Sequence, residues 1–429
     1  MLVDVNPINY IHKRRFPQFT IPAGVPFPRP ELLVRILHVL ATLDPQSGGP
    51  AQACLEMAQA VADRGHDVAI FATDFAVDGQ DGRPSNLGLF PKLDVRLFPV
   101  QAPRPWKRSS DMNRALRSEV ARFDIVHIHS LYLFHNWSAA RACRQNNVPY
   151  IVRPHGLLDP YIHRRHRWRK RLMEVAFQNH ALHCAAAIHY TADLERDISQ
   201  PYANNDRSVV IPLGVNLPDT NSSSIRSALS ERFPETANKT VLLFLSRLHR
   251  KKGLDLLIPA LAQARAVNPN LHLVLAGPDD GALADTLASI AQAGLENSVT
   301  ITGMLRGADK AAAFAGADFF VLPSYSENFA IAAAEAMAYG LPVIVSDQVN
   351  IHPDITASGA GMVVDCSVAS LTRAINDMAQ ADRPAMGRRA RILVEEKYSW
   401  PAVGRALEHL YATITADHQR GMPVATSNR

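Results

Sequence analysis

VRILHVLATLDPQSGGPAQACLEMAQAVADRGHDVAIFAT, residues 34–73, contains the pattern from which the fold class follows. Its first apolar run, at 34–42, ends in the turn-forming residues LDPQSGGP. An amphipathic helix pattern follows and stops at Gly65. The apolar face of that helix comprises Cys54, Leu55, Ala58, Val61 and Ala62. A second apolar run comes at 68–73, and strand, helix and strand in this order form the repeating unit of a parallel sheet.

The same alternation continues along the chain and is interrupted once, by a polar stretch. Before the interruption, strands are predicted at 93–100, 123–130, 148–156, 185–192 and 208–216. After it, the pattern restarts with strands at 241–246, 271–277, 298–303, 318–323 and 342–346. We therefore expect an α/β protein with two doubly wound, Rossmann-like domains and a cleft between them.

Five segments follow from this pattern. They are a proline-rich leader at 1–34, an N-terminal domain at 35–216, a linker at 217–239, a C-terminal domain at 240–395, and a C-terminal segment at 396–429. The last segment contains an amphipathic helix, which we expect to pack back across a domain and to be followed by a tail.

The composition is that of a globular protein with an anionic partner. Of the 429 residues, 47% are hydrophobic and 20% are charged, and the formal net charge is +5. This mild basicity suits an anionic substrate or membrane surface and does not demand nucleic acid. The four cysteines form no CxxC pair, which disfavours a zinc cluster and favours a reducing compartment. Without a long apolar run or a signal-peptide core, the protein is expected to be cytoplasmic.

Three stretches that follow predicted strands are candidates for ligand binding. The first is QSGGP, residues 46–50, where Gly48 and Gly49 let a ligand approach the backbone amides at a helix start. A phosphate group would suit those amides, although a tight turn alone explains two glycines equally well. The loop lacks the G-x-G-x-x-G spacing of dinucleotide-binding sites, so NAD is disfavoured.

The second stretch, SRLHRKKG at 246–253, follows the strand at 241–246. Arg247 offers a bidentate guanidinium and Lys252 a mobile point charge, and both suit phosphate oxygens. The alternative is an ordinary solvated basic loop.

The third stretch is SENFAIAAAEAMAYGLPVIVS at 326–346, where two carboxylates interrupt small and apolar side chains. Glu327 is expected near a helix start, where the dipole alone would favour it. Glu335 lies about two helical turns later, and eight residues at ~100° each bring it to within ~80° of Glu327. Both can then face one cleft and accept hydrogen bonds from sugar or ribose hydroxyls.

Taken together, these stretches resemble the retaining glycosyltransferases of family four, which have the GT-B architecture. RLHRKKG followed by ENFAIAAAEAMAYGLPVI is similar to that family's GRLxxxKG-like segment and E-x7-E motif, with Ser246 in place of a glycine. The glycine loop, DIVHIHS, IVRPHG, IHYTADLE and VIPLGVN also match, so the resemblance spans roughly residues 35–415.

The resemblance implies a role for each matched residue. Glu335 would hold the ribose hydroxyls, and Glu327 would contact the donor sugar. Arg247 and Lys252 would bind the diphosphate with help from Gly48 and Gly49, and the backbone at Met304 and Leu305 would contact the base. Asn328 and Phe329, which follow Glu327 in the same motif, are also expected to bind the donor. His155 would lie against the donor sugar, although His127 and His129 also follow a strand and could line the cleft.

The resemblance further implies transfer with retention, assisted by Lys252 and Arg247, in which the leaving phosphate oxygen helps to remove the acceptor proton. No D-x-D motif follows a predicted strand, since PDDG at 278–281 has a different spacing. We therefore expect neither a metal nor a cofactor beyond the nucleotide-sugar donor. The alternatives are a non-catalytic nucleotide-sugar-binding subunit, and an epimerase or phosphorylase with the same architecture.

A basic stretch with aromatic residues, at 161–178, bears on the acceptor. Its cations are Arg164, Arg165, Arg167, Arg169, Lys170 and Arg171, around Tyr161 and Trp168. Such a mixture suits an anionic lipid surface or a lipid-diphosphate acceptor, and a solvated basic helix is the alternative. RNA is disfavoured because no nucleic-acid-binding motif accompanies it. We expect peripheral attachment through 161–171 to the inner face of the cell membrane and a role in cell-surface polysaccharide synthesis.

Overall fold

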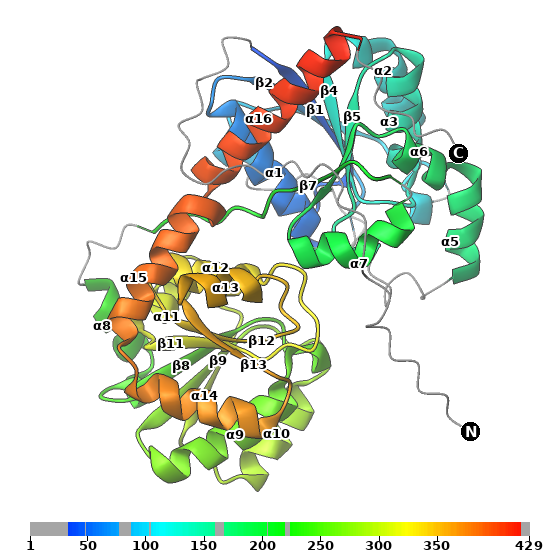
Figure 1. Ribbon diagram of the computed structural model, residues 1–429. Helices are drawn as coiled ribbons and strands as arrows, with labels where there is room; N and C mark the ends of the chain where they lie inside the picture. Colours follow the sequence, from blue (N-terminus) through cyan, green and yellow to red (C-terminus); the bar gives the residue numbers. More distant parts are fainter. Residues whose placement is uncertain are drawn as a thin grey trace.

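The computed structural model contains two α/β domains, which lie one above the other in Figure 1. The residues that it describes are 33–47, 49–76, 87–102, 104–158, 167–203, 205–218 and 224–421. Most of the predicted leader, Gly48 and residues 161–166 of the basic stretch therefore lie outside the described residues. No helix among the described residues combines the length and the apolarity needed to cross a membrane.

The N-terminal domain contains a parallel sheet of seven strands in the order β3-β2-β1-β4-β5-β6-β7. The strands are β1 Arg35–Thr42, β2 Asp67–Thr73, β3 Asp94–Phe98, β4 Ile125–His129, β5 Tyr150–Arg153, β6 Ala187–Tyr190 and β7 Ser208–Val210. The connecting helices are α1 Gly49–Ala62, α2 Ser110–Glu119, α3 Phe134–Gln145, α5 Arg167–Met173, a π-helix η6 Glu174–Gln178, α6 Asn179–His183 and α7 Asp193–Ala203. The order reverses beside β1, as expected for a doubly wound sheet.

Side chains alternate between the two faces of this sheet, and each face has its own core. Ile36, Ile125 and Ile151 pack with the helices α1 and α16 on one face. The residues next to them in sequence pack with α2, α3 and α6 on the other face. Both faces are covered, which explains the nearly continuous apolar runs of the strands.

The C-terminal domain contains a parallel sheet of six strands in the order β10-β9-β8-β11-β12-β13. The strands are β8 Thr240–Leu245, β9 Leu271–Ala276, β10 Val299–Gly303, β11 Phe319–Leu322, β12 Val343–Ser346 and β13 Gly361–Val364. The helices are α8 Ser224–Arg232, α9 Leu254–Val267, α10 Leu283–Gln292, α11 Gly307–Gly316, α12 Ile331–Ala338, α13 His352–Ser358, α14 Val368–Gln380 and α15 Arg383–Leu393. The predicted fold class, two Rossmann-like domains, is confirmed.

Two elements of the C-terminal domain were not predicted. The edge strand β13 was missed because it is only four residues long and mostly half-exposed, so it lacks the apolar run of a buried strand. The helix α8 lies inside the stretch predicted as a linker. It packs on α11, where Leu229 is buried and a Cβ at Gly316 would collide with the Leu229 side chain.

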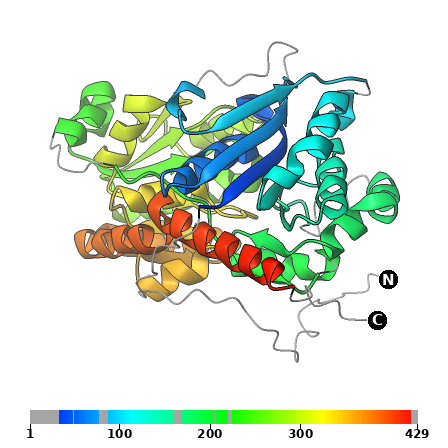
Figure 2. The ribbon, with the colours of Figure 1, turned by 90° about the horizontal axis from the view of Figure 1, so that it is seen from above.

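The end of the chain returns to the N-terminal domain. After α15 and a π-helical turn, Val394–Tyr398, the long helix α16, Trp400–Gln419, runs along that domain (Figures 1 and 2). At Gly404 an added Cβ would lie 2.8 Å from the Ala60 carbonyl oxygen, so α16 approaches α1 very closely. A backbone bridge between Val215 and Ser399 holds the two crossing segments together.

Candidate active site

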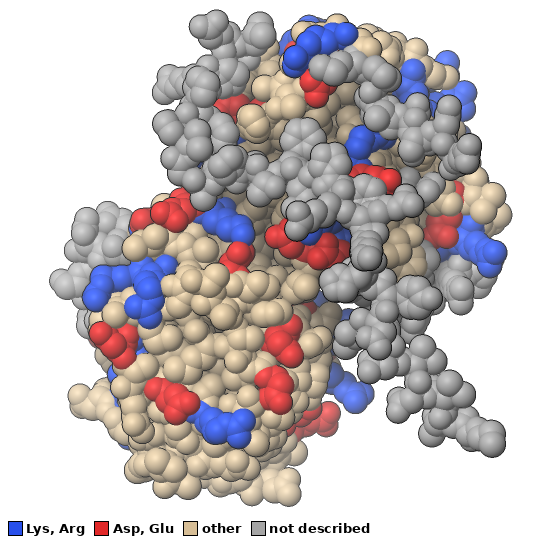
Figure 3. All heavy atoms as spheres, in the orientation of Figure 1, with Lys and Arg blue, Asp and Glu red and all other residues tan. Residues whose placement is uncertain are grey.

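The two domains meet at the carboxyl ends of their sheets. The Nδ2 of Asn328, which follows β11, donates to Oγ1 of Thr191, which follows β6, at 3.1 Å. The Asn328 side chain also lies 3.8 Å from the position of a Cβ at Gly156, which follows β5. Figure 3 shows acidic and basic side chains at the visible part of the boundary between the two domains. Ligands of open α/β sheets bind beyond the carboxyl ends of the strands, so the junction is the candidate site.

On the C-terminal side, Lys252 forms an ion pair with Glu327. Both side chains are mostly buried, at 12% and 20% exposure. Gly253, at φ +73°, makes this possible because a Cβ there would collide with the carbonyl oxygen of Pro323 at the end of β11. The loop of Lys252 can therefore lie directly against the loop of Glu327.

Glu327 lies before α12 and not within it, so the prediction of a helical spacing between Glu327 and Glu335 was wrong. Its N–H donates to the carbonyl of Gln348, and its own carbonyl accepts from the N–H of Asn350, both at 3.0 Å. These bonds hold Glu327 in an extended bridge, and α12 begins later, at Ile331. Glu327 is therefore not part of α12, and the eight-residue helical spacing to Glu335 does not apply.

Glu335 lies in the middle of α12 and pairs with Lys310 of α11 at 2.7 Å. Its side chain is 26% exposed, so it is only partly buried although alanines surround it in the sequence. Glu56 of α1 lies near this pair: burial raises the pKa of Glu56, the Glu335 charge raises it further, and the Lys310 charge opposes the rise. The pair thus faces the N-terminal domain. Neither Lys310 nor Glu56 carried a sequence signal, because each is the single residue of its charge in its helix.

The other predicted donor-binding residues of the C-terminal domain range from exposed to buried. Arg247 is 66% exposed and pairs with Asp280 at 2.5 Å, separately from the Lys252–Glu327 pair. Met304 is exposed after β10, and Leu305 packs partly on the core. Phe329 is only 3% exposed, and its ring meets that of Tyr398 edge-on at 5.3 Å. The Phe329 side chain is therefore a core residue, and a substrate-binding role for its ring is not supported.

On the N-terminal side, the turn after β5 has an unusual backbone. His155 adopts φ +54°, and the next residue, Gly156, also has a positive φ. Such conformations are costly for a non-glycine residue and gather at functional sites. The turn is held by buried Glu195, which accepts from the N–H of Gly156 at 3.0 Å and from the N–H and Oγ1 of Thr191 at 2.7 and 2.6 Å. Glu195 was not singled out from the sequence, although an acid within a first helical turn is a recognisable signal.

Of the three candidate histidines, only His155 is partly exposed, whereas His127 and His129 are fully buried. Ring nitrogens of His38, His127 and His129 lie within 4.8 Å of one another, a spacing that could suit a metal ion. Hydrogen bonds, however, already occupy every ring nitrogen of these three residues except Nε2 of His38.

At the start of α1, the predicted phosphate-binding residue Gly49 is exposed, and a Cβ there would meet nothing within 4 Å.

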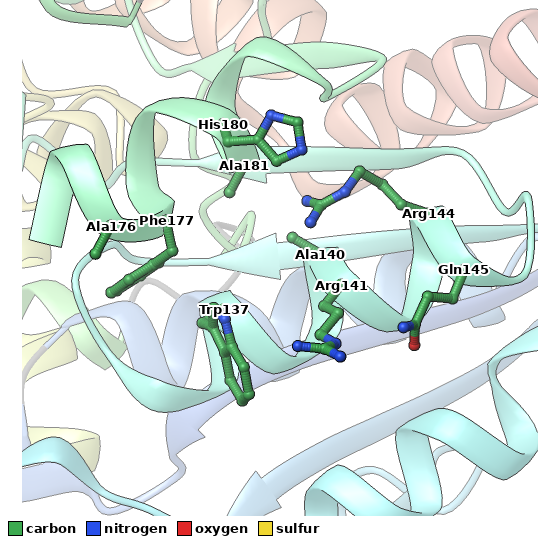
Figure 4. Close-up of a pocket in the computed structure, with 9 residues that line it drawn as sticks. All are labelled: Trp137, Ala140, Arg141, Arg144, Gln145, Ala176, Phe177, His180 and Ala181. Carbon is green, nitrogen blue, oxygen red and sulfur yellow. The ribbon is translucent and has the colours of Figure 1, made fainter.

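A pocket of about 340 Å³ lies elsewhere, on the outer surface of the N-terminal domain between α3 and the η6–α6 segment (Figure 4). Arg141 and Arg144 of α3 line one side, with Trp137 beside them, and Phe177 and His180 line the other. None of the predicted donor-site residues lines this pocket.

Both domains match family models of glycosyltransferases. A family model described as "Glycosyl transferase 4-like domain" matches residues 48–214, and "Glycosyl transferases group 1" matches 226–392. A GDP-mannose:cellobiosyl-diphosphopolyprenol alpha-mannosyltransferase of Komagataeibacter xylinus is 27% identical over 400 residues, 91% of this chain and 95% of its own. An alpha-monoglucosyldiacylglycerol synthase of Streptococcus pneumoniae is 27% identical over 319 residues, 71% of this chain and 69% of its own.

Solved structures share the fold. Anabaena HepE in complex with UDP gives a TM-score of 0.71 at 19% identity, over 88% of this chain and 100% of its own. Sucrose-phosphate synthase from Thermosynechococcus elongatus gives 0.68 at 21% identity, over 89% of this chain and 99% of its own. The two family models and the relatives support a glycosyltransferase, and the solved structures support its GT-B fold.

Proposed function

We propose that the protein is a retaining, metal-independent glycosyltransferase of family four. It moves a sugar from a nucleoside diphosphate sugar to a hydroxyl group of a lipid-linked or polysaccharide acceptor during cell-surface polysaccharide synthesis. The observation that carries the proposal is the Lys252–Glu327 ion pair beside the Asn328–Thr191 contact between the domains. In this pair, Lys252 is a cation for the diphosphate and Glu327 is an acceptor for sugar hydroxyls, and both lie at the same point of the junction.

The ion pairs at the junction suit a donor that replaces one partner in each pair. Lys252, Lys310 and Arg247 are each paired with a carboxylate. A diphosphate would take Lys252 and Arg247 from their carboxylates, while sugar and ribose hydroxyls would donate to Glu327 and Glu335. Cations that stabilise the leaving diphosphate supply an electrostatic contribution of the kind that is usually largest in catalysis.

In the proposed reaction, the bond from the anomeric carbon to the leaving phosphate oxygen breaks. The acceptor oxygen forms its bond on the same face of the sugar, and its proton passes to the leaving phosphate oxygen. Lys252 and Arg247 hold the diphosphate, and contact between the domains excludes water from the reacting sugar. The cations of the protein balance the diphosphate charge, so this scheme needs no metal ion.

The acceptor in this proposal is a lipid diphosphate or an oligosaccharide attached to one. The Komagataeibacter relative is named for a cellobiosyl-diphosphopolyprenol acceptor and the Streptococcus relative for a glucosyldiacylglycerol product, so both names involve lipids. The name of the Komagataeibacter relative makes GDP-mannose the first donor to test.

The test is a transfer assay with UDP-, GDP- and ADP-sugars and a polyprenyl-diphosphate oligosaccharide acceptor, with and without EDTA. We expect transfer from one donor class, an unchanged rate in EDTA, and a product whose anomeric configuration by NMR equals that of the donor. Inversion would contradict retention, and a loss of rate in EDTA would contradict metal independence. Nucleotide binding without transfer would point to a binding subunit instead.

We also propose that the α5–η6 region attaches the enzyme to the inner face of the membrane. Leu172 is 67% exposed and Val175 is 78% exposed, next to the exposed Arg171. Cations beside exposed apolar side chains favour an anionic lipid surface. In cosedimentation with phosphatidylglycerol vesicles, reversing the charges at 164–171 should release the protein. Equal sedimentation with neutral phosphatidylcholine vesicles, or with the variant, would contradict attachment by this segment.

A further inference from the structure

A stripe of polar side chains lies within the core of the N-terminal domain. It belongs to the sheet face beneath α1 and α16, which is otherwise apolar. Its members are His38 on β1, His127 and His129 on β4, Arg153 on β5 and His189 on β6, and all are 0% exposed. Buried polar groups destabilise a fold unless they find hydrogen-bond partners, so the direction of each hydrogen bond carries information.

One chain of hydrogen bonds has its direction fixed at one end. The carbonyl oxygen of Ile211 can only accept, so Nε2 of His189 donates to it, at 2.8 Å. Burial lowers the pKa of His189 well below its ordinary value, so the ring is neutral and its Nδ1 accepts from Nε2 of His127, at 3.3 Å. The Nδ1 of His127 must then accept from the hydroxyl of Tyr411 on α16, at 2.8 Å. This chain fastens α16 to the sheet.

A second chain leads to the junction between the domains. Nδ1 of His38 lies 3.0 Å from Nε2 of His129, and Nδ1 of His129 lies 3.0 Å from Nε2 of His155. Burial lowers the pKa of all three rings, to about 3 for His38, so each neutral ring carries one proton. The chain can therefore run in only two ways, toward His155 or away from it.

The buried end of this chain decides between the two directions. Nε2 of His38 is buried and has no hydrogen-bond partner among the described residues. If the chain ran away from His155, that nitrogen would carry an orphan N–H, which is rarer in protein interiors than an unpaired acceptor. The charge of Arg153 also acts on His38, and Nε and Nη2 of Arg153 are themselves buried without partners. A bare lone pair on His38 suits that cation, whereas an N–H would oppose it.

We infer that His38 and His129 are positioning residues that hold His155 with its proton on Nδ1. His38 donates to His129, and His129 donates to Nε2 of His155. His155 therefore offers an N–H to a ligand at the junction and cannot act as a general base through Nε2. The inference rests on the proposed function for the identity of that ligand, an oxygen atom of the donor sugar or its phosphate.

The experiment is two-bond ¹H–¹⁵N correlation NMR of the ¹⁵N-histidine-labelled enzyme near neutral pH without any ligand, with His155 assigned by His155→Asn. In the wild type, His155 should carry its proton on Nδ1. His38→Asp places a carboxylate, which can only accept, near the original Nδ1 and within reach of the Arg153 charge, so it should reverse the chain and move the His155 proton to Nε2. His38→Asn keeps a donor near the original Nδ1 and should retain the Nδ1 form. Tyr411→Phe breaks only the other chain and should leave His155 unchanged.

An Nε2 proton on His155 in the wild-type spectrum would overturn the inference, even if a variant fails to fold. An unchanged His155 in folded His38→Asp would also overturn it. If a donor is found, His38→Asp should lower kcat/KM about tenfold through the loss of one hydrogen bond to the ligand, and His38→Asn should keep most of the wild-type value. The NMR measurement needs no donor, so a failure of the proposed function leaves its result intact.

Discussion

The two domains differ in the charge and the burial of their polar side chains near the junction. The C-terminal domain presents partly exposed ion pairs, Lys252–Glu327 and Lys310–Glu335. The N-terminal domain contains a fully buried stripe of neutral histidines beside Arg153. Ion pairs that reach solvent contribute little and can exchange partners, whereas a buried hydrogen-bonded network is rigid. The difference suggests that the C-terminal domain neutralises a charged donor, while the N-terminal domain offers fixed, neutral hydrogen bonds.

Lowering the pH should have the largest effect on stability, and it should destabilise the N-terminal domain first. Burial lowers the pKa of His38 from 6.5 to about 3 and that of His135 to about 4. The unfolded chain therefore binds protons at a higher pH than the folded protein does. The stability is fully present above about pH 6.5 and is lost as the pH falls, by about 1.4 kcal/mol per pH unit for each such histidine.

The measurement is the free energy of unfolding by urea between pH 7.5 and pH 4.5. His38→Asn should reduce its slope with pH by about one proton, because one buried titrating group is gone. A free energy that stays constant across this range would contradict a neutral histidine core.

Removing the Glu327 carboxylate should have the next largest effect. Glu327→Ala should lower kcat by about 10²–10³-fold with a small change in nucleotide affinity, the loss expected for a contact made to the reacting sugar. Steady-state kinetics provide the measurement. Glu395→Ala is the matched control, because that carboxylate also pairs with a cation, Arg391, but outside the junction. Equal activities of the two variants would remove Glu327 from the proposed site.

Glu335→Ala should act on binding instead of turnover. Losing its hydrogen bonds to ribose hydroxyls should raise the Kd of a nucleoside diphosphate about tenfold, with kcat nearly unchanged. Isothermal titration calorimetry measures this Kd. The same titration with Lys310→Met should show whether the present partner of Glu335 competes with the nucleotide. An unchanged Kd for Glu335→Ala would contradict ribose binding by this carboxylate.

Tyr411→Phe should have the smallest effect. It removes the hydroxyl that donates to His127 and leaves a buried acceptor unpaired, which costs about 1–2 kcal/mol of stability. Urea unfolding at pH 7.5 measures the change. A variant as stable as the wild type would show that this hydrogen bond does not fasten α16.

The sequence predicted the architecture well because both sheets are built from buried parallel strands. Apolar runs such as 241–246 and 342–346 stand between clear turns, and each is a strand. The half-exposed β13 has no such run and was missed. The close packing of α16 on α1 depends on Gly404, a single residue that has no pattern in the sequence.

The candidate site was only partly predictable, since its contacts join distant residues. Lys252 and Glu327 are 75 residues apart, and both were singled out because each follows a strand. The place of Glu327 outside the helix depends on backbone bonds to residues 348–350, which no local pattern reveals. Likewise, the spacing of His127 and His129 puts them on one face, but the hydrogen bonds of His129 to His38 and His155 depend on strand register and on the turn after β5.

The Kd of a nucleoside diphosphate for Lys252→Met, compared with that for Lys397→Met, tests the central claim most directly. Both lysines belong to the C-terminal half and pair with a carboxylate, Glu327 and Asp354 respectively, but only Lys252 is assigned to the donor. In titrations with GDP, UDP and ADP, we expect the nucleotide that binds the wild type to bind Lys397→Met equally well and Lys252→Met at least about tenfold more weakly. Equal binding by both variants would contradict a diphosphate site at the Lys252–Glu327 pair.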